Sequence, residues 1–392
     1  MKKALQFGAG NIGRGFLGQL FFESGYATTF VDVTQPLIDA LNARGGYPIR
    51  ILGDHPETLL IENVRALNSR DVDAVAQSLA ESDLAATAVG VNVLPRIAPA
   101  IAAGIERRFE SADHKPLNII VCENLLDAGP ILREHVQGHL PHRFHGVLEE
   151  HVGFVEASIG RMVPVMNDVM RAEDELLIGV EAYCELPVDK AGFRGPIPTI
   201  KNMQPRENFS AYVERKLFVH NAGHAVTAYL GYHKGCEYIW QAIADEAVRA
   251  EVDAAMSESC AGLVRKHGMD VAALEAHKND LLRRFANRQL GDQVERVARD
   301  PIRKLGSRDR LVGAALMCLN QGIAPEHLAF AAAAAIRYDH PADPAAQQIQ
   351  ELFRKDGLAS VLRAFCGIQP ESELGTLIAA GMSQLEREKW VR

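Results

Sequence analysis

Cysteine is scarce in this sequence, and long apolar runs are missing from it. Six cysteines are spread over 392 residues, and no two of them form a C-x-x-C pair. This spacing favours reduced thiols in a cytoplasmic protein over a disulfide framework or a structural zinc site. No apolar run approaches the ~20 residues of a membrane span, and the N-terminus leads directly into a strand-like segment. We therefore expect neither a membrane partner nor a signal peptide.

Positive charge is also not in excess. The chain has 42 Lys and Arg against 50 Asp and Glu, a formal net charge of −8, which argues against nucleic acid as a partner. It lacks internal repeats and low-complexity tails. With 47% hydrophobic and 23% charged residues, it can bury the cores of two domains.

A histidine-rich tract at 135–151 matches no known metal-ligand signature. His135 and His139 have the i, i+4 spacing of a helical ligand pair, but Pro141 ends the helix directly afterwards. We expect a polar surface connection here and no metal.

The N-terminal segment carries a dinucleotide-binding pattern. A strand-like run at 4–7 leads into the motif G-x-G-x-x-G, which begins at Gly8 and opens a helical pattern. A second strand-like run contains Asp32, nineteen residues after the last glycine of the motif. A carboxylate at this place binds the adenosine ribose hydroxyls and repels a 2′-phosphate. No Arg or Lys follows in VDVTQPL, so NAD is favoured over NADP.

Each glycine of the motif has a steric task. Gly8 permits a tight turn, Gly10 lets the backbone approach a pyrophosphate, and Gly13 lets helix and strand pack closely. The helix N-terminus adds free N–H groups and positive potential for the phosphates. The candidate cofactor-binding residues are Phe7, Gly8, Ala9, Gly10, Asn11, Ile12, Gly13, Arg14, Asp32, Thr87 and Val89.

The segments up to about residue 164 alternate between strand-like and helix-like patterns. Continuous apolar runs at 83–90 and 117–124 are typical of parallel strands buried on both faces, and 151–164 is a further candidate strand. The segment 175–189 predicts a strand pair or an extension near the domain edge.

A linker rich in Gly and Pro, 191–205, precedes a region in which helical periodicity dominates. The predicted fold class is α/β: a Rossmann-type, doubly wound parallel sheet over 1–195 that binds NAD. An all-α domain over 196–392, carrying the substrate and catalytic residues, follows it.

Lys216, Asn221 and His224 lie in the apolar-periodic segment ERKLFVHNAGHAVTAYLG, which predicts a helix. At about 100° per residue these side chains fall at roughly 0°, 140° and 80°, so they share one face. A lysine, an amide and an imidazole together can hold an alcohol and move its proton. The alternative is an amphipathic helix with a solvated polar face.

Asn124 ends the apolar run at 117–124 and suits a substrate hydroxyl or the nicotinamide ribose. Ligands bind beyond the carboxyl ends of parallel strands, where this residue is expected. The alternative is that Asn124 caps the helix beginning LLDAGPIL.

The run RVARDPIRKLGSRDRL (296–311) places six basic side chains within sixteen residues of an acidic protein. It is a candidate anion site, because the planar arginine fork matches phosphate, and Ser307 could open a helix whose N-terminus adds attraction. A solvated helix with ion pairs is the alternative. The phosphate candidates are Arg299, Arg303, Lys304 and Arg308.

Several segments in order resemble the mannitol-1-phosphate 5-dehydrogenases, a branch of the polyol-specific long-chain dehydrogenases. They are FGAGNIGRG, TAVG, LNIIVCEN, EEHVGFV, ERKLFVHNAGHAVTAYLG, DQVERVARDPIRKL and DRL. The resemblance implies NAD-dependent interconversion of D-mannitol 1-phosphate and D-fructose 6-phosphate without a metal. It also implies that Lys216 is the general base and that Asn221, His224 and Asn124 bind oxygen.

One position departs from the pattern of those enzymes. Relatives commonly read VDRIVP where this chain reads IGRMVP, so Gly160 stands at the usual aspartate. The resemblance implies that this acid helps to set the substrate site, so the identity of the polyol phosphate stays open. Asp168 is a candidate to replace it.

Other functions stay open on the sequence alone. One is a dehydrogenase of another polyol phosphate, a free polyol, a hexuronate, a hydroxyacid or phosphogluconate, and another is a non-catalytic NAD-binding regulator. The expected partner is a small sugar or polyol phosphate, and the sequence does not decide between a monomer and a dimer.

Overall fold

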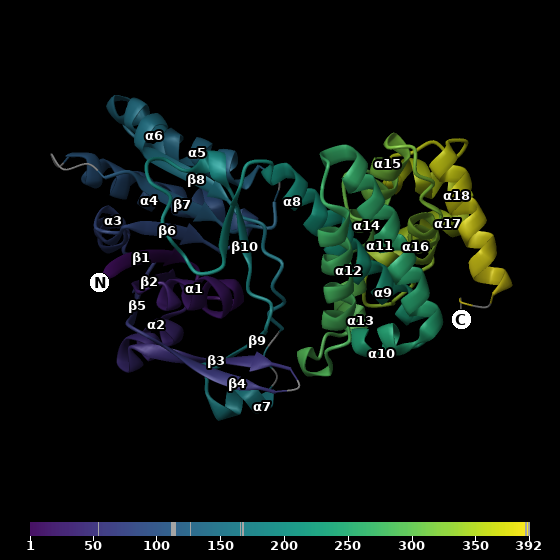
Figure 1. Ribbon diagram of the computed structural model, residues 1–392, viewed down its shortest axis with the longest axis horizontal. Coiled ribbons are helices and arrows are strands. Elements are labelled where there is room, and N and C mark those ends of the chain that lie inside the picture. Colours follow the sequence, from purple (N-terminus) through teal and green to yellow (C-terminus); the bar gives the residue numbers. More distant parts are fainter. Residues whose placement is uncertain are drawn as a thin grey trace. The chain divides into compact units, whose positions relative to one another are not determined.

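The computed structural model describes residues 1–53, 55–110, 115–125, 127–164, 166, 168–388 and 390, without the side chains of 168 and 169. The chain forms two compact units, Met1–Phe209 and Ser210–Arg392 (Figure 1). The boundary expected after residue 195 falls inside the first unit. This is because β11 (Met203–Arg206) pairs in parallel with β10 (Leu186–Asp189).

A six-stranded sheet forms the centre of the first unit. All its pairings are parallel, and the strand order is β5-β2-β1-β6-β7-β8. This is the 3-2-1-4-5-6 order of a Rossmann sheet, so the predicted fold class is confirmed. The strands are β1 (Lys2–Phe7), β2 (Tyr26–Asp32), β5 (Val64–Asn68), β6 (Leu84–Thr87), β7 (Leu117–Val121) and β8 (Val152–Glu156).

Both faces of this sheet are covered. Leu5 and Phe7 of β1 belong to a core completed by α3 (Val72–Ala80), α4 (Leu94–Glu110), α5 (Ala128–His139) and α6 (His145–His151). Ala4, on the opposite face, packs with Phe16 and Leu20 and with residues of 186–200. Because the strands are buried on both sides, their sequences read as continuous apolar runs.

A second sheet, of three strands, is inserted beside the first. β3 (Gly46–Leu52) and β4 (Glu57–Glu62) form an antiparallel hairpin between α2 (Gln35–Arg44) and β5, and β9 (Ile178–Glu181) runs parallel to β3. The segment 175–189 therefore contains two strands, as predicted. However, β9 and β10 pair with different partners and not with each other. A short helix, α7 (Asp168–Glu173), precedes β9.

The second unit is helical, in agreement with the prediction. Its helix α16 is buried on every side, because the alanine-rich residues Leu328–Ile336 are all buried. A helix that is apolar on every side belongs in the centre of a bundle. The helices are α8 (Phe209–Arg215), α9 (Ala222–His233), α10 (Ile239–Ala244), α11 (Glu246–His267), α12 (Val271–Phe285), α13 (Val294–Ala298), α14 (Pro301–Leu305), α15 (Val312–Asn320), α16 (Glu326–Ile336), α17 (Pro344–Val361) and α18 (Glu373–Arg387).

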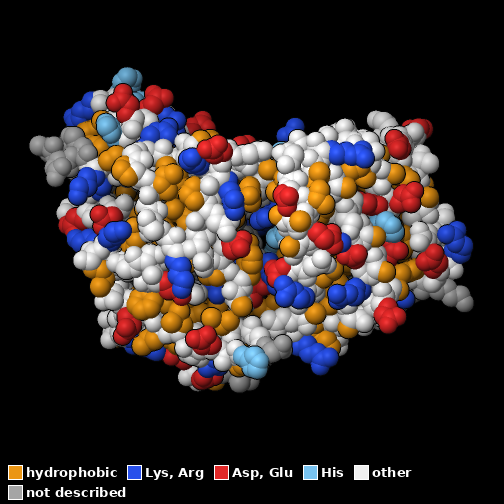
Figure 2. All heavy atoms as spheres, in the orientation of Figure 1, with side chains coloured by type: hydrophobic (Ala, Val, Ile, Leu, Met, Phe, Trp, Pro, Cys, Tyr) orange, Lys and Arg blue, Asp and Glu red, His pale blue; other side chains and the backbone are white. Residues whose placement is uncertain are grey.

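The surface carries charges of both signs. In the view of Figure 2, basic and acidic side chains alternate over both units. Among the described residues, no helix is both long and apolar enough to cross a membrane.

Candidate active site

The glycine turn after β1 has the geometry that its sequence predicts. Gly8 has φ +91°, a left-handed conformation that favours glycine. A Cβ on Gly8 would lie 2.4 Å from the carbonyl oxygen of Ala88, and one on Gly13 would lie 1.9 Å from that of Gly8. Gly10 has no atom within 4 Å of its Cβ position, so its backbone is open to a ligand. This geometry fits a dinucleotide pyrophosphate.

The helix after this turn starts in a wide register. Residues Gly13–Leu17 form a π-helical segment, η1, in which the N–H of Gly18 bonds to the carbonyl of Gly13; α1 (Gly18–Glu23) follows. Gly10 and Asn11 are exposed at its N-terminal end. Arg14, in contrast, is buried, and its guanidinium donates to the carbonyls of Ala9 and Leu176, both at 2.7 Å. Arg14 therefore braces the turn from within.

Asp32, at the end of β2, is held by the backbone. One carboxylate oxygen accepts from the N–H of Ala9 at 2.9 Å, and the other accepts from Val33 at 2.8 Å and Thr34 at 3.0 Å. A carboxylate has about four acceptor positions, so one remains for a ribose hydroxyl. Asp32 thus shapes the glycine turn and keeps one acceptor position open.

A basic residue near Asp32, Arg70, lies far along the chain from the segment VDVTQPL. Asp32 is the register partner of Asn68 on β5, and Asn68 accepts from the backbone N–H of Arg70 at 3.0 Å. The Arg70 side chain is exposed at the carboxyl end of β5. Only the pairing of β2 with β5 brings it near Asp32, 38 positions away along the chain.

Polar groups also gather at the ends of β6 and β7. The buried carboxylate of Glu123 accepts from the N–H of Val89 at 2.9 Å and of Gly90 at 2.8 Å. Burial raises the pKa of Glu123, and these bonds and Thr87 oppose the shift. Asn124 is exposed beyond β7 and is not the cap of the next helix, because α5 starts at Ala128 with Asp127 as its N-cap.

The helix that carries Lys216 is not a regular α-helix. Residues Lys216–Asn221 form a π-helical segment, η5, and the N–H of Ala222 bonds to the carbonyl of Leu217, five positions earlier. Residues five apart lie one turn apart in this register, so Asn221 lies over Lys216 more closely than an α-helix allows. Lys216, Asn221 and His224 are half-buried, and the residues between them are mostly buried. The three side chains form one partly enclosed polar strip.

His224 has an acidic neighbour that the sequence did not reveal. Its Nε2 lies 2.9 Å from an Oδ2 oxygen of Asp292, and the side chains are only 16% and 11% exposed. Asp292 also accepts from Nε of Arg296 at 2.8 Å. Burial raises the pKa of Asp292, but His224 and Arg296 outweigh it, so the net shift is downward. Asp292 is therefore a largely enclosed carboxylate between the nitrogens of His224 and Arg296.

Other imidazoles near this strip are uncharged. Burial, reinforced by Arg284 and His224, holds the pKa of His220 well below its usual value. Burial, with Arg215 and Arg284, lowers the pKa of His277 to about 3. The ring of Phe285 stacks on His224 with centroids 5.0 Å apart and an angle of 9°. The strip is thus bounded by neutral rings and by arginine charge.

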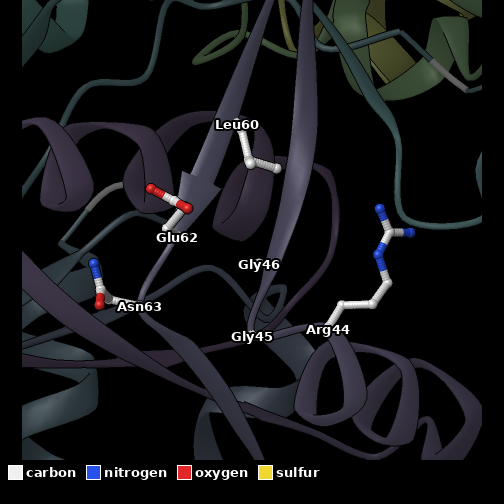
Figure 3. A pocket seen from close by; sticks show the side chains of 6 residues that line it. All are labelled: Arg44, Gly45, Gly46, Leu60, Glu62 and Asn63. Carbon is white, nitrogen blue, oxygen red and sulfur yellow. The ribbon is translucent and has the colours of Figure 1, made fainter.

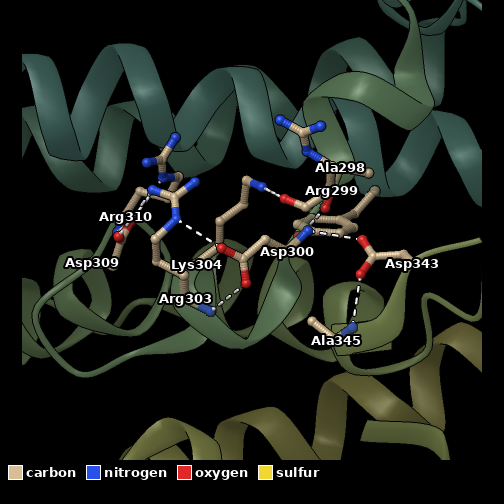
Figure 4. Close-up of polar contacts among 10 residues, drawn as sticks. Ala298, Arg299, Asp300, Arg303, Lys304, Asp309, Arg310, Asp343 and Ala345 are labelled. Carbon is tan, nitrogen blue, oxygen red and sulfur yellow. Dashed lines mark hydrogen bonds and ion pairs between the residues drawn. The ribbon is translucent and has the colours of Figure 1, made fainter. Parts of the chain in front are cut away.

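Much of the basic run at 296–311 is engaged internally (Figure 4). Arg303 donates to Asp300 at 3.1 Å, and Arg310 donates to Asp309 at 2.7 Å. Lys304 is buried, and its ammonium donates to the carbonyl of Arg299. Burial, helped by Arg310 and Arg303, lowers the pKa of Lys304 to about 7. These groups mainly hold the segment together.

Arg299 and Arg308 differ from the rest of the run. Both are exposed, and neither guanidinium has a hydrogen bond or ion pair among the described residues. In Figure 4 no dashed line joins the Arg299 guanidinium to the other residues drawn. Ser307 does not open a helix: it lies in the turn between α14 and α15, where Leu311 is the N-cap. That part of the expectation was wrong.

The remaining expectations concern Gly160, Asp168 and a metal site. Gly160 lies after β8 beside the buried Arg161, which donates to the carbonyls of Gly15 and Glu181. The Asp168 side chain is outside the described residues. Within the part of the chain that the structure describes, no three His, Cys, Asp or Glu side chains gather as a metal site.

One surface hollow is remote from the strand ends where ligands bind. A cavity of about 480 Å³ is lined by Arg44, Gly45, Gly46, Leu60, Glu62 and Asn63 (Figure 3). The carbonyls of Gly45 and Asn63 accept from the N–H groups of Val64 and Thr28 near the amino ends of β5 and β2. The hollow therefore lies at the opposite end of these strands from Asp32. Arg44 is already paired with Asp174 at 2.6 Å. This hollow carries no sign of the chemistry described above.

Comparison with known proteins assigns both units. The profile of the mannitol dehydrogenase Rossmann domain matches residues 2–202, and that of the mannitol dehydrogenase C-terminal domain matches residues 208–386. A ternary complex of Pseudomonas fluorescens mannitol 2-dehydrogenase with NAD and D-mannitol is similar in fold. It is 19% identical with a TM-score of 0.77, covering 99% of this chain and 92% of that one. Substrate-free D-sorbitol dehydrogenase is 16% identical with a TM-score of 0.83, over 99% and 93%.

Proposed function

The chain belongs to the mannitol dehydrogenase family, and we propose that it interconverts D-mannitol 1-phosphate and D-fructose 6-phosphate with NAD as the hydride carrier. The observation that carries the proposal is the strip of Lys216, Asn221 and His224 on the π-helical turn. An enclosed lysine beside an amide and an imidazole is suited to take a proton from a secondary alcohol. NAD takes up the hydride that leaves the same carbon.

Each group of the strip has a task in this reaction. In the oxidation, the Lys216 amine removes the hydroxyl proton, and the C–O bond becomes a carbonyl as the hydride departs. The Asn221 amide donates to the oxygen, which carries negative charge in the transition state. Asn124, in the first unit, is assigned to a substrate oxygen by its place beyond β7. Neither proton transfer nor oxygen stabilisation by these groups requires a metal.

The glycine turn supports the choice of NAD. Its tight backbone, the open face at Gly10 and the exposed helix start at Asn11 suit a pyrophosphate. Asp32 supports NAD over NADP, because a carboxylate repels a 2′-phosphate. We assign Phe7–Arg14, Asp32, Thr87 and Val89 to the cofactor site, with Arg14 acting through the backbone that it braces.

The phosphate on the substrate is supported by the basic run. Arg299 and Arg308 are its exposed guanidinium groups without a partner among the described residues, and we assign the phosphate to them. A free polyol is the second candidate, because the similar structures are named as mannitol and sorbitol dehydrogenases.

A substrate panel separates these candidates. NADH consumption is followed with fructose 6-phosphate, fructose and other ketoses and ketose phosphates. Clear preference for fructose 6-phosphate supports the proposal, and equal or better turnover of fructose supports the free polyol. NADH binding without turnover of any of them identifies a binding protein instead of an enzyme.

A further inference from the structure

The orientation of the His224 ring is fixed from two sides. Phe285 stacks against its face at 5.0 Å, and Asp292 lies at 2.9 Å from its Nε2 edge. The Nε2 atom is buried away from solvent. Among the described residues, no acceptor lies at a hydrogen-bonding angle to Nε2. Asp292, at ion-pair distance, is therefore the group beside Nε2 that can accept a hydrogen bond from an Nε2–H.

Asp292 is itself held in place. Arg296 binds its other carboxylate oxygen, with Nε at 2.8 Å, and the backbone carbonyl of Asp292 accepts from Ile239 at 2.9 Å. The backbone N–H of Val294 in turn donates to the carbonyl of Glu237 at 2.9 Å. These contacts tie the segment 292–294 to the start of α10. The carboxylate cannot follow a rotating imidazole without breaking them.

We propose that Asp292 is a positioning residue that holds His224 as the Nε2–H tautomer and leaves Nδ1 to accept a hydrogen bond from a hydroxyl of the polyol substrate. This inference rests on the function proposed above. An ionised carboxylate only accepts hydrogen bonds, so the nitrogen facing it carries the proton. In a neutral imidazole the second nitrogen is then an acceptor, because one hydrogen is shared between the two.

The proposal changes the expected task of His224. A neutral His224 of this tautomer cannot donate to the developing alkoxide through Nδ1, so that task falls to Asn221. His224 instead recognises a group that has a hydrogen to give, as each hydroxyl of a polyol chain does. A site that accepts from a hydroxyl discriminates against an analogue without one, since the buried acceptor would stay unpaired.

The test reads the Nε2–H group directly. In protein labelled with ¹⁵N-histidine, the wild type at pH 8 should show a slowly exchanging, downfield proton on Nε2 of His224, assigned through His224→Gln. Asp292→Ala should abolish that resonance and lower kcat/KM for the polyol substrate at least about tenfold, as loss of an orienting carboxylate does. Asp292→Glu should restore the resonance and part of the rate.

A matched control and a second variant complete the design. His327 Nδ1 pairs with Glu251 at 2.7 Å between α16 and α11, so Glu251→Gln removes a similar pair elsewhere and should change neither readout. If Asp292→Ala does not fold, the isosteric Asp292→Asn replaces it, and the resonance should move upfield because the acceptor has lost its charge.

Three results would overturn the proposal. They are a wild type without the resonance, an Asp292→Ala enzyme within about twofold of wild-type kcat/KM, and a resonance that survives Asp292→Ala. If the wild type turns over no polyol and no polyol phosphate, the proposed function fails. The resonance then decides by itself whether Asp292 holds the tautomer.

Discussion

The glycine turn of the first unit and the Lys216 strip of the second both use a π-helical segment, but their sequences reveal them to different degrees. At the turn, η1 begins at Gly13, five residues after Gly8, and a Cβ on either glycine would meet a backbone oxygen at 1.9 or 2.4 Å. At the strip, η5 contains ordinary residues, KLFVHN, that are equally compatible with an α-helix. A steric requirement restricts the residue type and is therefore visible in the sequence. A change from the α to the π register does not restrict it.

This difference alters the geometry inferred for the strip. Regular α-helical spacing places Lys216 and Asn221 roughly 140° apart, which is a wide separation for two groups acting on one oxygen. The i+5 bond of the π register moves Asn221 back over Lys216. Such segments are frequent at functional sites, because they re-aim side chains without ending the helix.

The largest expected effect comes from removing the lysine of the strip. Lys216→Ala should lower kcat at least about 10²-fold, the lower range for loss of an acid–base group. NADH binding should persist, because the proposed cofactor residues belong to the first unit. Single-turnover hydride transfer at saturating substrate measures the effect.

The control for this variant lies at the C-terminal end of the helix that continues from η5. Lys234 is exposed just after α9, so Lys234→Ala should stay within a few-fold of wild type. If Lys216→Ala also stays within a few-fold, Lys216 is structural, and His224 becomes the better candidate for the base.

The next effect concerns the two kinds of arginine in the basic run. Arg299→Ala and Arg308→Ala should be tested separately, and at least one should raise KM for fructose 6-phosphate about tenfold. This matches the ~1.5–3 kcal/mol of a hydrogen bond to a charged group. Turnover at saturation should change less, since the phosphate is remote from the reacting carbon.

Arg303→Ala serves as the matched control, because its guanidinium is already bound to Asp300 at 3.1 Å. Arg303→Ala should raise KM for fructose 6-phosphate less than Arg299→Ala or Arg308→Ala does, whichever of those two has the larger effect. If fructose and fructose 6-phosphate react comparably, or if Arg303→Ala has the largest effect on KM, the assignment of the phosphate to Arg299 and Arg308 is wrong.

The sequence predicted what depends on local sterics and periodicity. The Rossmann order follows from apolar runs separated by helical patterns, and Gly8 and Gly13 identified the turn. The β3–β4 hairpin was missed because its strands carry Pro48, Arg50 and two glutamates and lack a continuous apolar run. The partly exposed position of this small sheet permits such residues, which hides its strand character.

Side-chain pairing across the chain was the other part beyond reach. His224 and Asp292 are 68 positions apart, and neither residue type predicts the other. The same limit applied to the basic run. Charge density alone indicated an anion site, but Asp300, Asp309 and the Arg299 carbonyl engage Arg303, Arg310 and Lys304. Counting charges along a segment does not reveal which of them are already paired.

A smaller effect tests the first unit. NADH should be preferred to NADPH by at least about tenfold in kcat/KM, about 1.4 kcal/mol, because Asp32 repels a 2′-phosphate. Asp32→Asn should lower the ratio of kcat/KM with NADH to kcat/KM with NADPH, because the repelling charge is lost. The amide oxygen of the new side chain keeps part of the backbone contacts. Asp32→Ala should weaken both cofactors, since it leaves the N–H groups of Ala9, Val33 and Thr34 without their acceptor.

Arg70 sharpens this prediction. It is exposed at the end of the strand beside Asp32, so any residual use of NADPH should fall further in Arg70→Ala. Steady-state rates with both cofactors decide the matter. Equal use of NADH and NADPH by the wild type would contradict the assignment of Asp32 to the ribose.

The smallest effect is a pH dependence of stability caused by Lys304. Its pKa is about 7 in the folded protein, below the ~10.4 of an unfolded chain, so the unfolded state binds more protons between these values. The contribution of Lys304 to stability is therefore least favourable below pH 7 and improves as the pH rises. From pH 7 to pH 8 the gain should be about 1 kcal/mol, measured by urea unfolding. Lys304→Met should lose this gain in the free energy of unfolding, and the exposed-site control Lys355→Met should keep it.

If the free energy of unfolding of Lys304→Met still rises by the wild-type amount between pH 7 and pH 8, Lys304 keeps its proton in the folded protein. Lys304 would then be a full charge inside the basic run and would return as a candidate for binding phosphate.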